Sequence, residues 1–272
     1  MASSLQLAAV KDLLRRSALF GLLPEDHLAA VLSSLRLECF AAEAVIVEEG
    51  APGEACYVVA EGQAIAVSRD LIGEATVLAE LQPGDLVGHV ALVRGVPQPV
   101  TVRATTELQA YVLGRESFAH LVASCPAFAE SVRRQASLQE IATFLMKASV
   151  FSTLSPEVVL QLAAELDPLS MPGGSTVIRE GDSGDTFYLV RRGSLAVEAE
   201  GRELRRLTTG DCFGEVALVA DVKRTATVRA VTDCDLLVLS RPDFETVVSV
   251  DRRMRDRLLE LAQIRYRATG GQ

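Results

Sequence analysis

The amino-acid sequence predicts a mainly β protein with flanking helices, built from two copies of one domain. Two observations support this prediction. The same short motifs recur in the same order in both halves of the 272-residue chain. Within each half, short β-type runs separated by glycines follow one another roughly every ten residues, a pattern typical of a small antiparallel sandwich or barrel.

The repeat begins at a constant offset. Residues 20–24 (Phe-Gly-Leu-Leu-Pro) resemble residues 151–155, and residues 49–59 resemble residues 180–190, both 131 positions later. Motifs that keep their order at one offset indicate two copies of a single domain.

The offset then falls to 126. Residues 84–88 resemble residues 210–214, and residues 101–104 resemble residues 227–230. A longer hairpin loop at residues 70–74 of the first copy would absorb this change at little entropic cost. A period of about 130 residues indicates a domain duplication rather than a solenoid. The predicted domains are residues 1–133 and 134–272.

Each copy is expected to begin with two helices. Apolar residues recur at helical spacing in the first segment. A proline stands at the start of the second segment, where a helix tolerates it. The first helices are expected at residues 5–17 and 138–148, and the second helices after Pro24 and Pro156.

Short strands follow these helices in both copies. They are expected at residues 45–47, 57–59, 64–67 and 77–81, and at residues 176–178, 187–190, 195–197 and 204–207. After Leu113 and Leu239 the pattern becomes helical again. Ser240 is the expected N-cap of the second of these helices, with Asp243 three residues on.

A final helix is expected at residues 251–267. Met254, Leu258 and Leu261 give it an apolar stripe, with several arginines around it. Such a helix packs on its own domain, covers a ligand, or forms a dimer seam, and the sequence leaves these roles open.

Composition narrows the functional class. The net charge of −9 gives no overall basic footprint for nucleic acid. Five cysteines without a CxxC pair indicate a reducing cytoplasm rather than a disulfide framework or a zinc site. Three scattered histidines give no metal cluster. The sequence contains no apolar run long enough to predict a membrane span. Its first residues do not resemble a secretory signal.

The segment that carries chemistry is residues 213–228. It places one carboxylate, Glu215, and one guanidinium, Arg224, nine residues apart around a short stretch that can form a helical turn. Gly214 lets the backbone approach a ligand closely, and the start of the turn offers free N–H groups to an anion. Arg224 can donate two charge-assisted hydrogen bonds to phosphate, whereas an ionised Glu215 accepts from a hydroxyl. Together they suit a singly charged phosphate that also carries a sugar hydroxyl.

This segment resembles the phosphate-binding cassette of cyclic nucleotide-binding domains. Residues 213–218 (Phe-Gly-Glu-Val-Ala-Leu) and 224–228 (Arg-Thr-Ala-Thr-Val) carry the resemblance. The tandem arrangement is similar to the regulatory subunits of cyclic AMP-dependent protein kinase. The resemblance covers nearly the whole chain and implies two jelly-roll-like β-rolls, each with N- and C-terminal helices. Both copies also carry the family's glycines, at Gly50, Gly62, Gly84, Gly181, Gly193 and Gly210.

The resemblance also implies a ligand, cyclic AMP or cyclic GMP, and a role for each cassette residue. Glu215 would accept from the ribose 2′-hydroxyl, and Arg224 would pair with the cyclic phosphate. The N–H groups of Ala217 and Thr225 would reach phosphate oxygens. In the family, burial of the phosphate then repositions the C-terminal helix. The ligand-binding residues expected on this basis are Phe213, Gly214, Glu215, Val216, Ala217, Leu218, Arg224, Thr225 and Ala226.

The first copy departs from this pattern. His89 stands in place of the glutamate, Gln98 in place of the arginine, and Pro99 in place of the residue whose N–H meets the phosphate. Losing one charge-assisted contact costs about 1.5–3 kcal/mol. The first domain is therefore expected to bind no cyclic nucleotide and to serve as a structural or docking domain. The alternative is a different ligand, with His89 as a titratable contact.

The choice of base is left open. Thr225 resembles the threonine of cyclic GMP-preferring members, whose hydroxyl can bond the guanine, but one hydroxyl biases the choice without deciding it. The residue that covers the base should come from the last helix. The candidates are Arg257, Leu258, Leu261 and Tyr266.

A second motif lies near the N-terminus. Residues 15–19 (Arg-Arg-Ser-Ala-Leu) read like a kinase pseudosubstrate. The repeat aligns them with residues 146–150, at a helix end inside the domain, so a structural role is expected.

Two functions remain. The first is a cytoplasmic cyclic nucleotide sensor that binds ligand in its second domain and signals to an unidentified effector protein. The alternative is a scaffold that binds no nucleotide. An enzyme is not expected, because no nucleophile–base pair appears. A transcription factor is not expected either, because residues 251–272 are too few for a helix-turn-helix. Membrane insertion is not expected, and a homodimer is left open.

Overall fold

The structure is a computed structural model, and it describes residues 4–69, 75–148, 150–151 and 154–269. The expected hairpin loop at residues 70–74 lies outside the described residues. The chain divides into two compact units, Met1–Glu140 and Ile141–Gln272. The domain limits expected from the sequence, with a boundary after residue 133, stay a prediction.

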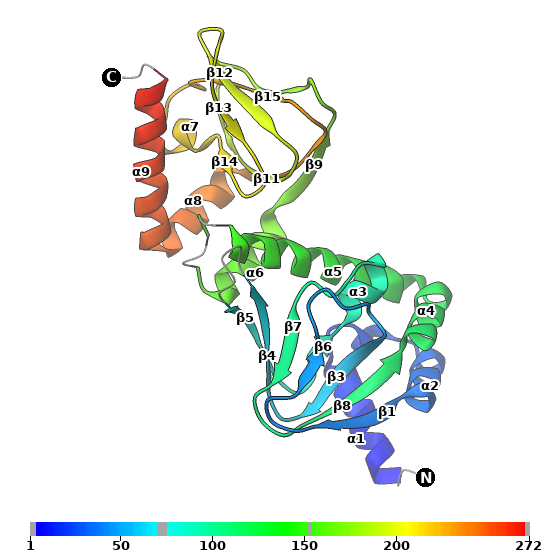
Figure 1. The fold of residues 1–272 in the computed structure, drawn as a ribbon. Helices are drawn as coiled ribbons and strands as arrows, with labels where there is room; N and C mark the ends of the chain where they lie inside the picture. The colour runs from blue at the N-terminus through cyan, green and yellow to red at the C-terminus, as the bar shows by residue number, and fades with distance from the viewer. Residues whose placement is uncertain (1–3, 70–74, 149, 152–153, 270–272) are drawn as a thin grey trace. The chain divides into compact units, whose positions relative to one another are not determined.

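In the first unit, helices precede and follow the strands of the roll in the sequence, and one short helix lies between two strands (Figure 1). The second helix begins after Pro24, as expected from the sequence. The helices are α1 (Ser4–Arg16), the short 3₁₀ helix η1 (Phe20–Leu22), α2 (Glu25–Ser34), α3 (His89–Arg94), α4 (Arg115–Ser124) and α5 (Pro126–Lys147), whose last turns belong to the second unit.

The described strands of the first unit form two antiparallel four-stranded sheets. One sheet has the order β1-β8-β3-β6 and the other β2-β7-β4-β5. The strands are β1 (Arg36–Phe40), β2 (Val45–Val47), β3 (Ala55–Glu61), β4 (Ala64–Arg69), β5 (Ala75–Leu81), β6 (Leu86–Val87), β7 (Thr101–Ala104) and β8 (Leu108–Gly114).

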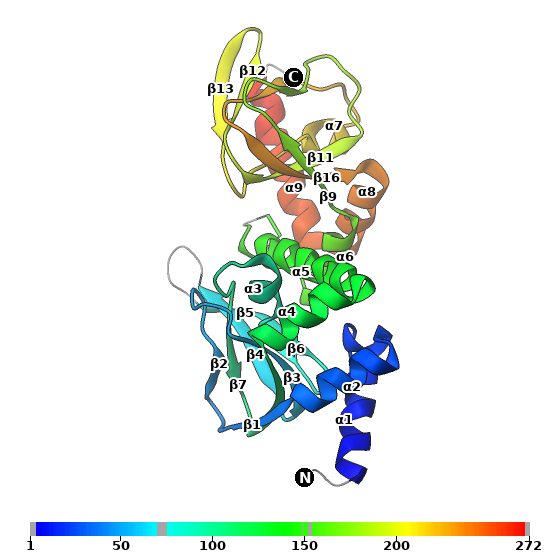
Figure 2. The same ribbon diagram turned by 90° about the vertical axis from the view of Figure 1, so that its right-hand side faces the viewer.

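The second unit repeats this arrangement (Figure 2). Its described strands form sheets of order β9-β16-β11-β14 and β10-β15-β12-β13, the same pairing as in the first unit. The strands are β9 (Asp167–Met171), β10 (Thr176–Ile178), β11 (Thr186–Arg192), β12 (Leu195–Ala199), β13 (Arg202–Leu207), β14 (Cys212–Phe213), β15 (Thr227–Ala230) and β16 (Cys234–Ser240). The predicted fold class, two β-rolls with flanking helices, is confirmed.

Four helices complete the second unit. Ser240 caps one of them by accepting from the N–H of Asp243, as the sequence predicts. The last helix runs beside the roll and contacts the short helix of the cassette. These helices are α6 (Pro156–Glu165), α7 (Glu215–Val219), α8 (Arg241–Val250) and α9 (Arg252–Ala268).

The repeated phenylalanines lie in the two cores. Phe20 is fully buried and contacts Phe128 with the ring planes tilted by 33° and the ring centroids 5.5 Å apart. Its counterpart Phe151 meets Phe187 edge-on at 6.3 Å, and Phe187 contacts Phe244 at 5.3 Å. The repeated motifs therefore mark equivalent core positions, which explains why the sequence repeat predicts the fold.

Two expectations about elements are incomplete. The helix expected at residues 138–148 begins at Pro126, because apolar residues continue along the same face in the earlier turns. The strands β1, β6, β7 and β8, and their counterparts β9, β14, β15 and β16, were not predicted. β6 and β14 have only two residues each, and β1 and β9 are largely exposed, so no buried alternation marks these four strands. No helix within the described residues is long and apolar enough to cross a membrane.

Candidate functional site

The cassette of the second unit starts at a glycine with a left-handed backbone. Gly214, between β14 and α7, has φ +89°. A Cβ atom there would lie 2.7 Å from the carbonyl oxygen of Thr186 and 2.8 Å from Nη1 of Arg224. Only glycine fits both the backbone conformation and the close approach. The turn consequently places Glu215 at the first position of α7.

Arg224 is held in place by two backbone carbonyl oxygens and one hydroxyl oxygen. Its Nη1 donates to the Gly214 carbonyl at 2.9 Å, and its Nη2 donates to the carbonyl and hydroxyl oxygens of Thr186 at 2.8 and 3.0 Å. The guanidinium also lies 5.9 Å from the centre of the Tyr188 ring. At 4 % exposure, this arginine is a buried cation with a fixed orientation.

A second glycine makes room for this arginine. A Cβ atom on Gly184 would come within 2.5 Å of Arg224 Nε and 2.8 Å of the Ala217 Cβ. Gly184 therefore belongs to the site through the space that it leaves.

Glu215 is the buried carboxylate of the site, with 1 % of its side chain exposed. Its Oε1 accepts from Nη1 of Arg265, on helix α9, at 2.7 Å. The same Nη1 donates to the carbonyl oxygen of Cys212 at 2.8 Å. The last helix of the chain therefore takes part in the cassette.

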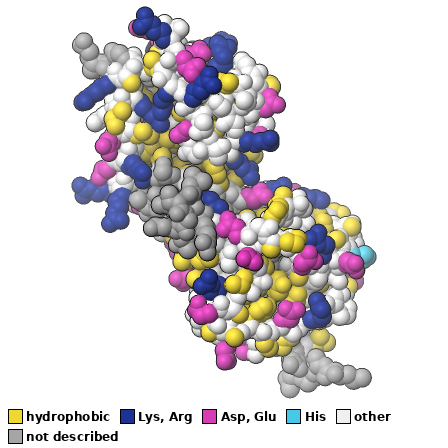
Figure 3. Space-filling view, in the orientation of Figure 1, with side chains coloured by type: hydrophobic (Ala, Val, Ile, Leu, Met, Phe, Trp, Pro, Cys, Tyr) yellow, Lys and Arg dark blue, Asp and Glu magenta, His cyan; other side chains and the backbone are white. Residues whose placement is uncertain are grey.

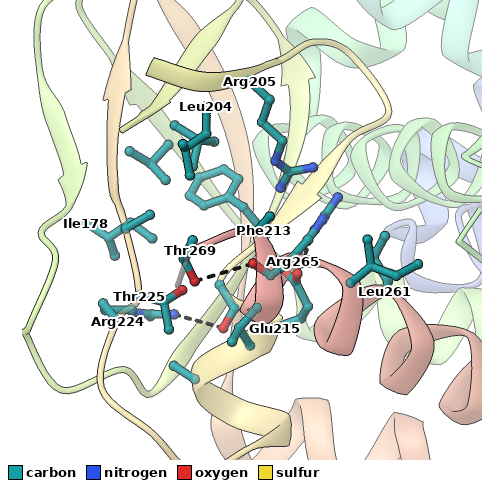
Figure 4. A pocket seen from close by; sticks show the side chains of 18 residues that line it. Ile178, Leu204, Arg205, Phe213, Glu215, Arg224, Thr225, Leu261, Arg265 and Thr269 are labelled. Atoms are coloured by element: carbon teal, nitrogen blue, oxygen red, sulfur yellow. Dashed lines mark hydrogen bonds and ion pairs between the residues drawn. The ribbon is translucent and has the colours of Figure 1, made fainter. Parts of the chain in front are cut away.

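These residues border a cavity of about 260 Å³ (Figure 4). One water molecule occupies about 30 Å³, so the cavity has room for a small organic molecule. Apolar side chains of the roll form its walls, and α9 closes one side. The lining residues outside the expected cassette are Ile178, Val197, Leu204, Arg205, Val228, Leu261, Ile264, Arg265, Ala268 and Thr269.

The structure brings eight of the nine expected residues to this cavity. Leu218 is the exception, because it packs into the hydrophobic core with Leu237 and Leu239. Its place on the far face of the short helix α7 explains this difference. The expected residues that line the cavity are Phe213, Gly214, Glu215, Val216, Ala217, Arg224, Thr225 and Ala226.

Three buried polar atoms around the cavity have no hydrogen-bond partner. They are Glu215 Oε2, Arg224 Nε and Arg265 Nε. Buried polar groups are nearly always paired in folded proteins, so an unpaired group calls for an explanation. One acceptor and two cationic donors around one cavity suit a ligand that carries both a hydroxyl group and negative charge.

Burial and neighbouring charges change the ionisation of these groups. Burial lowers the pKa of Arg224. It also lowers the pKa of Arg205, and the charge of Arg265 lowers it further. For Arg265 burial again lowers the pKa, but the interactions with Glu215 and Cys212 together outweigh it, so the pKa is raised. Burial raises the pKa of the Cys212 thiol to about 12, so this cysteine stays neutral.

The two units differ in charge. The first unit has 10 basic and 17 acidic residues, whereas the second has 17 and 19. Lysine and arginine side chains are frequent on the face of the second unit seen in Figure 3. The excess of negative charge is therefore smaller in the second unit, and its electrostatic field repels an anion less than that of the first unit.

Helix α9 supplies three apolar side chains to the cavity, those of Leu261, Ile264 and Ala268. Of the four residues expected to cover the base, only Leu261 lines it. Leu258 is fully buried in the core, and neither Arg257 nor Tyr266 lines the cavity. Ile264, which is 60 % exposed, lies at the cavity instead.

Three polar residues that line the cavity and one glycine beside it were not predicted from the sequence: Arg205, Arg265, Thr269 and Gly184. Arg265 carried a signal, because it stands four residues after Leu261, on the apolar face of its helix. Arg205 is half-buried on β13 and has no hydrogen bond or ion pair with any described residue. A run of two arginines there gave no indication of which one faces inward.

The first unit contains a cassette of the same shape with different side chains. Gly88 also has a left-handed backbone, with φ +83°, and leads into α3. His89 and Gln98 are buried, with exposures of 1 % and 4 %. Neither ring nitrogen of His89 has a hydrogen-bond partner, and burial lowers its pKa to about 4. A neutral histidine and an amide thus replace the buried ion pair and cation of the second unit.

The N-terminal arginine motif lies within folded structure. Arg15 is in α1 and donates to the carbonyl oxygens of Gly21 and Leu23 at 3.0 and 2.7 Å. Ser17 and Leu19 are buried, with exposures of 4 % and 2 %. A pseudosubstrate must be accessible, so the structural interpretation is confirmed. Elsewhere in the described part of the chain, no three His, Cys, Asp or Glu side chains gather as a metal site would need.

Comparison with protein families agrees with the cassette. The sequence profile of the cyclic nucleotide-binding domain matches residues 37–125 and again residues 168–251. The two matches fall in the two units and together cover more than half of the chain.

The chain is also similar to individual proteins. The chain is 31 % identical over 210 residues to a cGMP-dependent protein kinase of Caenorhabditis briggsae, covering 75 % of this chain and 26 % of the kinase. It is 29 % identical over 254 residues to the cAMP-dependent protein kinase regulatory subunit of Emericella nidulans, covering 89 % and 60 %. The regulatory domain of Toxoplasma gondii PKA, solved with cAMP, is 25 % identical, with coverage of 97 % and 98 % and a TM-score of 0.46. The chain spans less than two thirds of the length of the Caenorhabditis briggsae kinase and of the Emericella nidulans regulatory subunit.

Proposed function

The chain belongs to the cyclic nucleotide-binding domain family, and we propose that it binds one cyclic mononucleotide, in its second domain. The observation that carries this proposal is the cavity where Arg224, Glu215 and the first turn of α7 meet. Arg224 and the free N–H groups of that turn, including the N–H of Ala217, suit a cyclic phosphate. Glu215 Oε2, buried and unpaired, suits a ribose hydroxyl.

We propose cyclic GMP as the preferred ligand. Guanine offers two acceptors, O6 and N7, to which an arginine fork bonds, whereas adenine has a donor in place of O6. Arg205 lines the cavity with no hydrogen bond or ion pair among the described residues, and the hydroxyl of Thr225 lies on the same cavity. Both side chains can donate to guanine.

The first domain is proposed to bind no cyclic nucleotide. His89 is neutral and buried, Gln98 carries no charge, and Pro99 has no N–H to donate. A singly charged phosphate would find no cation among these three residues. A structural or docking role suits this domain.

The proposed output is a change in contact with another protein. Helix α9 closes the ligand cavity, so a ligand in that cavity changes how α9 is held. The names of the relatives suggest a protein kinase catalytic region as the class of effector. The chain is proposed to regulate rather than catalyse, and homodimer formation stays open. Five free thiols favour a reducing compartment, so the cytoplasm is its proposed location.

Calorimetric titration of the full chain with cyclic GMP and cyclic AMP tests this function. Saturable binding that is tighter for cyclic GMP, and is lost in Arg224→Ala, is expected. No binding of either nucleotide, to folded protein free of co-purified ligand, would leave the alternative, a scaffold built on two β-rolls.

A further inference from the structure

In the first unit, one arginine joins the short helix of the cassette to the long helix that ends the unit. Arg94 is the last residue of α3. Its Nη2 donates to the hydroxyl oxygen of Ser137, and its Nε lies 3.2 Å from Oε1 of Glu140. Both partners belong to α5, which runs beside α3 (Figures 1 and 2). We call these three residues the α3–α5 clamp.

The carboxylate of the clamp is more enclosed than those of other ion pairs in the first unit. The side chain of Glu140 is 20 % exposed, whereas those of Glu25, Glu43 and Glu54 are 69 %, 73 % and 74 % exposed. Exposed ion pairs contribute little to stability, but charge-assisted hydrogen bonds in more enclosed places are stronger. One guanidinium also binds two side chains three residues apart, which lie on the same face of α5.

The clamp holds α5 near the end of the first unit. Val132, in an earlier turn of α5, lies in the hydrophobic core of the first unit. Ile141, directly after Glu140, lies in the core of the second unit. The clamp therefore fixes α5 to the first unit just before the helix enters the second.

The second unit has no equivalent of the clamp. The residues that stand 126 positions after its three members are Ala220, Gln263 and Tyr266. None of the three carries a charge at neutral pH, so no ion pair forms at these positions. The clamp is therefore specific to the first copy, whose cassette lacks the carboxylate and the arginine of the second.

The clamp also lies away from the place where a ligand would sit. Ala220, the counterpart of Arg94, does not line the cavity of the second unit. His89, which stands in place of the cavity carboxylate, takes no part in the clamp, because its ring nitrogens have no hydrogen-bond partner. The hold on α5 consequently needs no ligand.

We propose that the α3–α5 clamp keeps α5 docked on the first cassette at all times, so that the first unit is locked in one state. A ligand switches a protein only between states that differ little in free energy. Undocking α5 would break two contacts of a charged group, which raises the free energy of the undocked state. Only the second unit is then free to respond to a ligand, and this last part alone rests on the proposed function.

Hydrogen–deuterium exchange of the full chain tests the clamp without any ligand. Arg94→Ala should make residues 137–147 of α5 exchange about fivefold faster, because undocking no longer breaks a charge-assisted contact. Glu140→Gln should have a smaller effect in the same direction. The control is Arg133→Ala, which removes an exposed arginine of the same helix and should exchange like the wild type.

The double variant shows whether the two residues act together. Arg94→Ala and Glu140→Gln remove the same contact, so their combined effect should be smaller than the product of the two separate factors. Factors that multiply would overturn the clamp, and so would exchange in Arg94→Ala at the wild-type rate. If Arg94→Ala does not fold, Arg94→Gln replaces it, because glutamine keeps part of the side chain and removes its charge.

Cyclic GMP provides the second arm of the experiment. In the wild type it should slow exchange in α9 and leave residues 126–140 of α5 unchanged. Slower exchange in both helices would overturn the locked state of the first unit. If neither helix responds, the proposed function loses its support, while the variants still decide whether the clamp exists.

Discussion

The two cassettes of this chain share one backbone and differ in the side chains that could meet a ligand. In the second unit the N–H of Arg224 donates to the carbonyl of Asp182 at 2.8 Å, and in the first the N–H of Gln98 donates to the carbonyl of Ala51 at the same distance. The loop that presents an arginine in one unit thus presents an amide in the other, in the same frame. The backbone therefore does not explain why only the second cassette is a candidate binding site.

The difference lies in a few buried polar positions. The second unit buries a cation and a carboxylate around a cavity, and it leaves polar atoms there unpaired. The first unit buries the neutral ring of His89 at the equivalent position. A duplicated fold can thus retain its packing while one copy loses the charges that a phosphate needs.

Removal of the cation should have the largest effect on the comparison. Arg224→Ala removes a fixed, buried guanidinium, and we expect nucleotide affinity to fall by about 3 kcal/mol or more, roughly a hundredfold. Calorimetry measures this loss. Arg229→Ala, an exposed arginine on β15, is the control and should bind normally. Retained affinity in Arg224→Ala would mean that the ligand does not use this cassette.

Acid should destabilise the first unit through His89, the residue that stands in place of Glu215. The folded state lowers the pKa of His89 to about 4, whereas an unfolded histidine titrates near 6.5. The unfolded state binds the proton first as pH falls, so stability is lost between pH 6.5 and 4, by roughly 2 kcal/mol at pH 5. Hydrogen–deuterium exchange of β3 and β8 measures this loss of stability.

The control for this acid effect is His89→Leu, which removes the titrating group. Its exchange in β3 and β8 should depend less on pH than that of the wild type. Identical pH profiles in the two proteins would contradict the account of a buried neutral histidine.

The two cassette glycines allow a matched comparison. An added Cβ would lie 2.7 Å from a carbonyl oxygen at Gly214 and 2.5 Å from one at Gly88, both at positive φ. Each Gly→Ala variant should therefore lose roughly 2 kcal/mol of stability, measured by thermal unfolding. Only Gly214→Ala should also weaken nucleotide binding. Equal effects on binding would show that the first unit takes part in it.

The preference for guanine should be the smallest effect. Arg205→Met and Thr225→Ala each remove donors from the cavity, so each should weaken cyclic GMP binding by about 1–2 kcal/mol while changing cyclic AMP binding less. Competition titrations measure the ratio of the two affinities. Arg206→Met is the control, because Arg206 is exposed and paired with Glu203 on the same strand. A ratio that stays constant in both variants would remove the argument for cyclic GMP.

Much of the fold was predictable because its signals are local and repeated. Phe20 and Phe151 occupy equivalent core positions, and the glycines of the cassettes stand where the backbone is left-handed. Both features are visible as residue types at a fixed offset. The start of α5 at Pro126 was missed, since its helical period runs across the expected domain boundary.

The candidate site was predictable only within one continuous segment. Residues 213–226 carry a recognisable cassette, but Gly184, Arg205 and Arg265 come from separate elements. Sequence spacing does not show which side chain of a strand or helix faces a distant loop. The arginine on α9 is the clearest example, because its carboxylate partner lies 50 residues away.

The number of cyclic GMP molecules bound per full chain shows whether the second domain alone holds the ligand. Calorimetric titration measures the number of sites per chain together with the affinity. We expect one site per chain, and no site in Arg224→Ala. Two sites per chain, or one site that survives in Arg224→Ala, would contradict the assignment of binding to the second domain alone.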